Sequence, residues 1–292
     1  MDKVKSGNDS ENLAGLKKRK LQLKAESSSF VPSSLTKRSS KSPKAASLTQ
    51  PIINETNVDQ EELDKIIMQI INLKNKSLRD EAFKQLSLKI QEDKNLPSLL
   101  WHTPGVIVIM LQEIIITYPL LSNNQLDPTH MNKLINVLGL FQVIAQDPKT
   151  KLPFLKSNLH LYFYPLINTA NKMRHYENLR VHSLAVIGAL VKKDDNTEVI
   201  NYLVKTELIV LCLRTMKKGT DMAKSVAIFI VRKILMNNAG LEFVCTTEER
   251  LQAVVDILKD MVNDMDRNQQ TVTLSLAKQI LRCFLRLSEN MR

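Results

Sequence analysis

The segment Ser183-Leu184-Ala185-Val186-Ile187 is echoed 42 residues later by Ser225-Val226-Ala227-Ile228-Phe229. The same offset relates three further pairs of apolar residues: Val199 with Leu241, Leu203 with Cys245, and Ile209 with Leu251. In a helical chain, a period near 42 residues is typical of armadillo and HEAT repeats, in which each unit packs only on its neighbours. The sequence therefore predicts a stack of helical repeats that presents a long surface to partners.

Apolar residues follow the helical period elsewhere in the chain as well. Residues three and four positions apart lie on one face of a helix, so an apolar stripe at that spacing indicates a helix buried on one side. Four stretches have this spacing: Leu63, Ile66, Ile67, Ile70 and Ile71; Leu134, Val137, Leu138, Phe141 and Ile144; Leu251, Val254, Val255, Leu258, Met261 and Val262; and Leu274, Ala277, Leu281, Phe284 and Leu285. The two-residue alternation of strands is never sustained, so we predict an all-α fold.

Helix breaks are expected at Asp127-Pro128, Asp147-Pro148, Gly219 and Gly240. The stretch 217–221 has the composition of a complete junction between two helices. Its two lysines complement the negative end of the first helix dipole, and Gly219 is expected to supply a left-handed cap. Either Thr220 or Asp221 is expected to cap the helix that follows.

Residues 1–57 differ from the rest of the chain. They are rich in Ser and Lys, contain one aromatic residue and carry +6 of the total net charge of +11. Burying so few apolar side chains would not offset the conformational entropy lost on folding. We therefore predict a disordered basic tail. Within it, the cluster Lys17, Lys18, Arg19 and Lys20 is of the kind that nuclear import receptors bind; the alternative is a solvated basic tail.

The composition of residues 58–292 indicates a reduced, soluble body. The three cysteines are odd in number and widely spaced, which is not the pattern of a disulfide framework. No apolar run reaches the roughly 18 residues that a membrane span needs, and the amino-terminal end has no apolar core of a leader peptide. We therefore expect a protein of the cytosol or nucleus that does not bind membranes.

The motifs that carry catalysis are missing from the sequence. It contains no glycine-rich phosphate loop, no Cys-x-x-Cys pair and no His-Glu-x-x-His motif. His175 and His182 are seven residues apart, but no third ligand lies nearby, so packing explains them better than metal binding. We predict that the protein is not an enzyme and needs no metal or other cofactor.

Several segments, in order and nearly without gaps, resemble one known family. They are Leu100-Trp101-His102-Thr103-Pro104-Gly105, the motifs at 111–114 and 118–119, Arg174-His175-Tyr176-Glu177-Asn178-Leu179-Arg180, and the motifs at 183, 186–192, 198–201, 211–214 and 282–288. The chain is similar over residues 58–292 to the cell-differentiation (Rcd-one-like) family, the noncatalytic armadillo-type subunit of the CCR-NOT mRNA deadenylase complex.

The resemblance implies about six armadillo-like repeats and an adaptor role. Such a subunit docks on the NOT scaffold and receives peptides of RNA-binding regulators, thereby directing deadenylation, decay and translational repression. It works in the nucleus and the cytoplasm, including P-bodies. Carried over to this sequence, the residues are Trp101, His102, Val108 and Ile115 for the scaffold; Asn178, Ala185 and Val226 for the peptide groove; and Arg250 and Arg292 for a cleft.

The sequence also departs from the family pattern. The family has an aromatic residue where Pro104 stands, tyrosines where Asn178 and Glu248 stand, and a glycine where Ala185 stands. These changes are expected to alter scaffold docking, a tryptophan pocket and the width of the peptide groove. The family also continues into further helices past the position of Arg292, so apolar surface is expected at that end of the stack.

A second function stays open, that of a nucleic-acid-binding protein or transcriptional cofactor. It would act through the basic tail and through an arginine-bearing groove formed by successive helices, with scattered solvated charges as the alternative. The arginines are Arg174, Arg180, Arg214, Arg232, Arg250, Arg267, Arg282 and Arg286. Nucleic acid is therefore a further candidate partner. A second copy of the chain, in a homodimer, is another candidate. An import carrier is disfavoured because the body lacks a regular Trp/Asn ladder.

Overall fold

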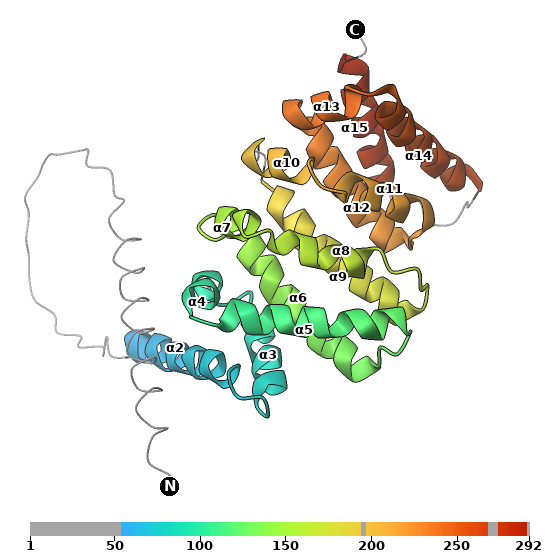
Figure 1. Ribbon diagram of the computed structural model, residues 1–292. Helices are drawn as coiled ribbons and strands as arrows, with labels where there is room; N and C mark the ends of the chain where they lie inside the picture. The colour runs from blue at the N-terminus through green and yellow to red at the C-terminus, as the bar shows by residue number, and fades with distance from the viewer. Residues whose placement is uncertain (1–53, 194–196, 268–273, 291–292) are drawn as a thin grey trace, which may run out of the picture. The chain divides into compact units, whose positions relative to one another are not determined.

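The structure is a computed structural model that describes residues 54–193, 197–267 and 274–290 (Figure 1). The import cluster Lys17–Lys20, most of the predicted tail and Arg292 lie outside the described residues. The chain divides into two compact units, one ending at Lys89 and the other beginning at Ile90. Within the described ranges all regular secondary structure is helical and none is strand, which confirms the predicted all-α fold.

In the first unit, α2 (Asn54–Asn72) packs on α3 (Arg79–Leu88). The predicted apolar face of α2 is buried at Leu63, Ile66, Ile67 and Ile70. Two polar contacts close the pair: Arg79 Nε donates to the carbonyl of Leu73 at 2.9 Å, and Lys89 forms an ion pair with Glu62. The hydrogen bond from Lys89 holds the pKa of Glu62 below its usual value.

The second unit is a row of helical repeats (Figure 1). Each repeat has one short helix followed by two helices that pack on the next repeat, and the second repeat carries an additional 3₁₀ turn, η1 (Leu159–Phe163). The repeats are α4 (Leu96–His102), α5 (Val106–Ser122) and α6 (Pro128–Gln146); α7 (Lys151–Lys156), α8 (Tyr164–Ile167) and α9 (Arg174–Val191); α10 (Thr197–Leu203), α11 (Leu208–Lys218) and α12 (Asp221–Met236); and α13 (Asn238–Cys245), α14 (Glu248–Arg267) and α15 (Leu274–Asn290).

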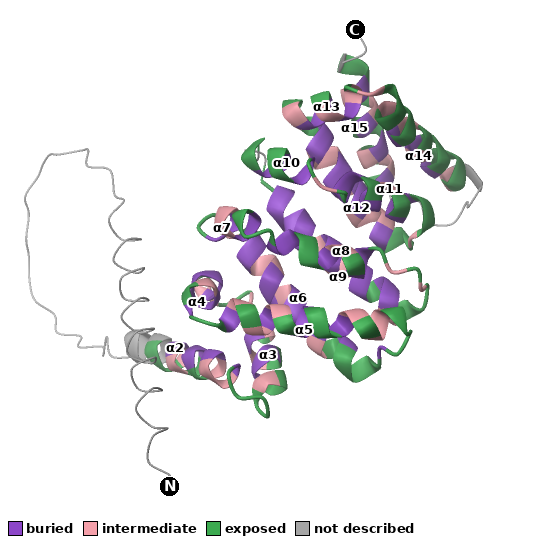
Figure 2. Ribbon diagram, viewed as in Figure 1, coloured by how far each residue is buried: buried purple, intermediate pink, exposed green. Residues whose placement is uncertain are grey.

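Two rows of helices build the core of this unit. Helices α6, α9, α12 and α15 pack one after another, and α5, α8, α11 and α14 form the second row. The 42-residue echo falls on this scheme, because 183–187 lies in α9 and 225–229 lies at the equivalent place in α12. Figure 2 shows buried residues along α6, α9 and α12. The helical-repeat prediction is confirmed, although the described part of this unit contains four three-helix repeats, where about six were expected for the whole domain.

The orientation of α15 differs from the prediction. Leu274, Leu281 and Leu285, which were expected to face the core, are 69%, 66% and 65% exposed. The buried residues are instead Leu276, Ile280, Cys283 and Leu287. This helix has apolar residues on two faces, so periodicity alone selects the wrong one.

The junction between α11 and α12 has the predicted caps but a different glycine geometry. Thr220 caps α12, since its side chain accepts a hydrogen bond from the amide of Ala223. Gly219 has φ −78° and ψ 172°, so the predicted left-handed cap is wrong. The reason for glycine is close approach, because a Cβ there would lie 2.7 Å from the carbonyl oxygen of Thr215.

Gly240 was expected to break a helix, and that prediction is also wrong. It lies inside α13, whereas the break falls at Asn237, which caps α13 by accepting from the amide of Ala239 at 3.0 Å. A Cβ at Gly240 would lie 2.1 Å from the carbonyl oxygen of Ile234. Glycine is therefore required so that α13 can pack against the end of α12.

We expect Gly240→Ala to destabilise the protein by ~2 kcal/mol or more, because a backbone carbonyl cannot move aside as a side chain would. The matched control is Gly188→Ala in α9, where the new Cβ would meet the ring of Phe229 at an ordinary 3.8 Å. That change is expected to be neutral or stabilising by up to about 1 kcal/mol, since alanine favours a helix interior. Urea unfolding measures both, and equal free energies of unfolding for the two variants would contradict the steric explanation.

His160 in η1 is a buried titratable residue without a hydrogen-bond partner. Its side chain is 1% exposed, and neither ring nitrogen has a partner. Burial lowers the pKa of His160 to about 4. The unfolded chain therefore binds a proton at higher pH than the folded chain does, which makes stability fall as the pH falls from about 6.5 towards 4.

When the pH is lowered from about 7.5 to about 5, His160 binds a proton mainly in the unfolded chain. This is expected to lower the free energy of unfolding by roughly 2 kcal/mol. His160→Leu should remove this contribution, so that its free energy of unfolding changes less across the same interval. Urea unfolding at the two pH values gives the comparison. The assignment to His160 fails if the wild type and the variant lose the same amount.

Candidate functional site

The residues predicted to bind the scaffold lie on α4 and α5. Trp101 is half-buried and His102 is exposed at the end of α4. Gly105, with φ 85°, starts α5 in a left-handed conformation that glycine adopts without strain. No single described helix is long and apolar enough to span a membrane; α4 and α5 meet that requirement of length and composition only as a pair bent by 88°.

The outer face of α5 is mainly aliphatic, with the exposed Gln112 among its apolar side chains. Val108 is 58% exposed and Ile115 is 41% exposed, and they lie two helical turns apart on the same side. Ile116 is also 58% exposed, although the sequence reasoning did not select it. The opposite face is fixed by Glu113, which is 6% exposed and forms an ion pair with Lys133 of α6 at 2.8 Å. Val108 and Ile115 thus share one surface of α5, and the scaffold-binding role of all four residues stays a prediction.

The residues predicted for the peptide groove lie on α9 and α12. Asn178 is exposed and Ala185 is half-buried on one face of α9, with half-buried His182 between them. Burial lowers the pKa of His182. Val226 is half-buried on α12, which packs against α9. The fold therefore brings these residues onto neighbouring helices, while peptide binding there stays a prediction.

The predicted cleft arginine Arg250 is already engaged within the protein. Its guanidinium lies 4.2 Å from the ring centre of Phe243 and donates to the carbonyl of the same residue at 2.7 Å. Glu248 is exposed in the first turn of α14, close in sequence to this contact. The cation–π contact and the hydrogen bond hold Arg250 against Phe243 of α13.

The arginines proposed for a nucleic-acid groove differ in exposure and in the partners that they contact. Arg180 and Arg286 are committed to internal partners, and Arg286 bonds to the carbonyl of Leu235 at 3.2 Å and to two further residues of α13 and α15. Arg174, Arg214 and Arg282 are exposed. Arg232 is half-buried over the ring of Phe229 at 5.5 Å, and the side chain of Arg267 lies outside the described residues.

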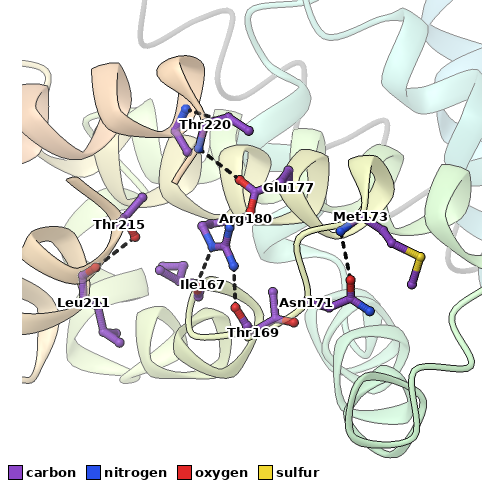
Figure 3. Close-up of polar contacts among 10 residues, drawn as sticks. Ile167, Thr169, Asn171, Met173, Glu177, Arg180, Leu211, Thr215 and Thr220 are labelled. Atoms are coloured by element: carbon purple, nitrogen blue, oxygen red, sulfur yellow. Dashed lines mark hydrogen bonds and ion pairs between the residues drawn. The ribbon is translucent and has the colours of Figure 1, made fainter. Parts of the chain in front are cut away.

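Arg180 is the centre of a buried polar cluster, shown in Figure 3. Its Nε donates to the carbonyl of Ile167 at 3.0 Å, and its other nitrogens bond to Glu177 and to the carbonyl of Thr169. The second oxygen of Glu177 accepts from the backbone amide of Thr220 at 3.4 Å. The cluster, which we call the arginine lock, therefore joins the end of α8, the first turns of α9 and the start of α12.

Two cavities lie beside the arginine lock. The first has a volume of about 520 Å³ and is lined by Ile167, Asn168, Thr169, Ala170, Lys172, Glu177, Arg180, Leu211, Arg214, Thr215, Lys218 and Gly219. The second has a volume of about 390 Å³ and is lined by Tyr118, Leu121, Ser122, Asn124, Pro165, Thr169, Ala170 and Asn171. They share a wall formed by Thr169 and Ala170. Arg180 and Arg214, two of the arginines predicted for a nucleic-acid groove, line the first cavity, whereas none of the residues predicted for the scaffold, the peptide groove or the cleft lines either one.

The described part of the chain contains two buried cysteines and no group of side chains arranged as metal ligands. Within the described ranges, no group of three or more His, Cys, Asp or Glu side chains is arranged to hold a metal ion. Cys212 and Cys283 are buried, and burial raises the pKa of each thiol to about 12. Since the thiolate is the reactive form, these two cysteines are poor nucleophiles at neutral pH.

Arg180→Met is expected to destabilise the protein by ~3 kcal/mol or more, because it leaves the Glu177 carboxylate buried without its cation and two carbonyls without a donor. Arg174→Met removes an exposed arginine from the same helix and should change stability by less than about 0.5 kcal/mol. Urea unfolding compares the two. Similar losses in both variants would show that the arginine lock contributes nothing particular to stability.

The comparisons with known proteins agree with this architecture. A family model described as "Cell differentiation family, Rcd1-like" matches residues 69–292. The cell differentiation protein rcd1 of Schizosaccharomyces pombe is 44% identical over 223 residues, which are 76% of this chain and 77% of the relative. Protein CAF40 of Saccharomyces cerevisiae is 40% identical over 213 residues, which are 73% of this chain and 56% of that protein. The predicted resemblance is confirmed, and the chain belongs to the Rcd1-like cell differentiation family.

Proposed function

We propose that this protein is a noncatalytic adaptor subunit of the CCR-NOT complex. It binds the NOT scaffold through α5 and presents further surfaces to peptides of RNA-binding regulators. Membership of the Rcd1-like family supports the assignment, and the exposed apolar face of α5 is the observation that carries the scaffold contact.

The face of α5 has the properties of a protein interface. Val108, Ile115 and Ile116 are β-branched apolar side chains that are exposed on one helix of an otherwise well-buried repeat. Burying such side chains stabilises a complex by roughly 25 cal/mol for each Å² removed from water. Because Glu113 and Lys133 fix the helix from behind, the face is presented without a large ordering cost.

The groove residues Asn178, Ala185 and Val226 would receive regulator peptides on the second face of the stack. In this proposal the protein acts as a bridge, so that a regulator bound to a message brings the deadenylase to it. The outcome is deadenylation, decay and translational repression. The place of action is the nucleus and the cytoplasm, including P-bodies.

Direct nucleic-acid binding has less support from the described residues. The guanidinium of Arg180 is satisfied by internal partners, and that of Arg250 is stacked on Phe243. The exposed arginines Arg174, Arg214 and Arg282 lie on three different helices of the repeat unit. A nucleic-acid backbone needs a continuous series of cations for tight, salt-sensitive binding.

A pull-down with the scaffold's binding segment tests the adaptor proposal. Replacing both Val108 and Ile115 with Asp is expected to lower the affinity at least a hundredfold, because two buried charges in an apolar interface are unpaired. Val210→Asp is the matched control: Val210 is 50% exposed, but it lies on α11, and its replacement should leave binding within roughly twofold. The proposal is wrong if the wild type does not bind, or if the control weakens binding as much.

A further inference from the structure

The larger of the two cavities beside the arginine lock is strongly cationic. Four of its lining side chains are Lys172, Arg180, Arg214 and Lys218, and a single lining side chain, Glu177, is acidic. They come from the α8–α9 connection, from α9 and from the end of α11. The α8–α9 connection with the start of α9, and the more distant α11, therefore place positive charge around one opening.

The one carboxylate of this wall is already neutralised. Glu177 is paired with Arg180 and accepts from the amide of Thr220, and both charged side chains are less than a tenth exposed. Lys172, Arg214 and Lys218 are exposed around the same cavity, and no lining carboxylate remains to balance them. The guanidinium of Arg214 donates a 3.3 Å hydrogen bond to the side chain of Asn168, which also lines the cavity. The cavity is thus prepared for an anionic group.

The smaller cavity continues this surface but differs in chemistry. Its lining contains no charged side chain; it has the aromatic ring of Tyr118, the ring of Pro165 and two side-chain amides. Those amides, Asn171 and Asn124, are fixed by a mutual 2.8 Å hydrogen bond, and the Tyr118 hydroxyl donates to the carbonyl of Tyr162 at 2.7 Å. A rigid, uncharged cavity therefore lies directly beside a cationic one.

We propose that these two cavities form a binding site for an extended acidic peptide of a partner protein. A Glu or Asp side chain of the peptide enters the larger cavity and pairs with Arg214 and Lys218 above the apolar floor of Ile167 and Leu211. The neighbouring uncharged residue of the peptide lies in the smaller cavity, across the wall of Thr169 and Ala170. The proposal rests on the adaptor function, since a regulator of the complex would supply the peptide.

The arrangement fits a peptide carboxylate better than a nucleic acid. A nucleic-acid strand carries a charge at every nucleotide, and single-strand sites line their path with cations and with aromatic rings on which bases stack. Here the cations surround one cavity and the next is uncharged. A peptide with one acidic and one uncharged side chain matches that change along the surface, and Arg–carboxylate pairs add geometric specificity.

Fluorescence anisotropy with the full chain tests the site. The probe is a labelled peptide of the repeated tripeptide Ser-Glu-Leu, compared with a peptide in which Gln replaces every Glu. We expect the Glu peptide to bind roughly tenfold more tightly, a difference that shrinks as salt screens the charges. A labelled single-stranded oligonucleotide of equal net charge is titrated in parallel and should bind more weakly than the Glu peptide.

Variants locate the binding. We expect Arg214→Glu and Lys218→Glu each to lower the affinity for the Glu peptide roughly tenfold, since each reverses a charge at the opening. Ala170→Trp adds a bulky uncharged side chain to the shared wall and should weaken both peptides. Lys205→Glu, a charge reversal at an exposed residue outside both cavities, should change binding by less than roughly twofold. Thermal melting verifies that each variant is folded.

Three results would overturn the site: equal binding of the Glu and Gln peptides, a loss in Lys205→Glu as large as in Arg214→Glu, or an oligonucleotide that displaces the Glu peptide. The Val108→Asp, Ile115→Asp double variant separates the two proposals. It should keep peptide binding while losing the scaffold. Failure of the wild type to bind the scaffold would reject the adaptor function, whereas failure of the peptide titration would reject this site alone.

Discussion

The contact between Arg180 and Glu177 connects consecutive repeats of the second unit. Helix α8 spans only Tyr164–Ile167, and a helix that short leaves its final carbonyls without partners inside the helix. Arg180 donates to the carbonyls of Ile167 and Thr169, and Glu177 accepts from the amide that starts α12. One buried ion pair thus satisfies backbone groups in two repeats. Its members are stable in the interior because each has several hydrogen-bond partners.

The same contact shapes the surface beside it. Because Arg180 binds the carbonyl of Thr169, the α8–α9 connection is fixed against α9 instead of moving freely. Thr169 and Ala170 can then act as the common wall of the two cavities. The two arginines of the larger cavity therefore differ: Arg180 is saturated by the fold, whereas Arg214 is exposed, as the proposed peptide site requires.

The sequence predicted helices well and their orientation less well. For α6, one apolar stripe exists, and all of its predicted residues, such as Leu134 and Phe141, are buried. For α15 there are two stripes, so only the neighbouring helices decide which is buried, and Leu281 lies on the exposed one. The roles expected of Gly219 and Gly240 failed for a related reason. At both positions a Cβ would collide with a backbone carbonyl of another turn or helix, and sequence periodicity contains no information on such contacts.

The candidate sites show the same limit. Val108 and Ile115 could be predicted because the family resemblance singles them out, whereas Ile116 does not stand out among the apolar residues at 106–111 and 114–116. Arg180 and Arg214 of the larger cavity were among the eight arginines predicted for a groove. The cavities themselves could not be predicted, since their walls come from α5, α8, α9 and α11 and from the short α8–α9 connection. Charges that are scattered along the sequence become a site only when the arginine lock fixes that connection. It follows that the cationic rim can change by substitution without loss of the fold, while Arg180 cannot.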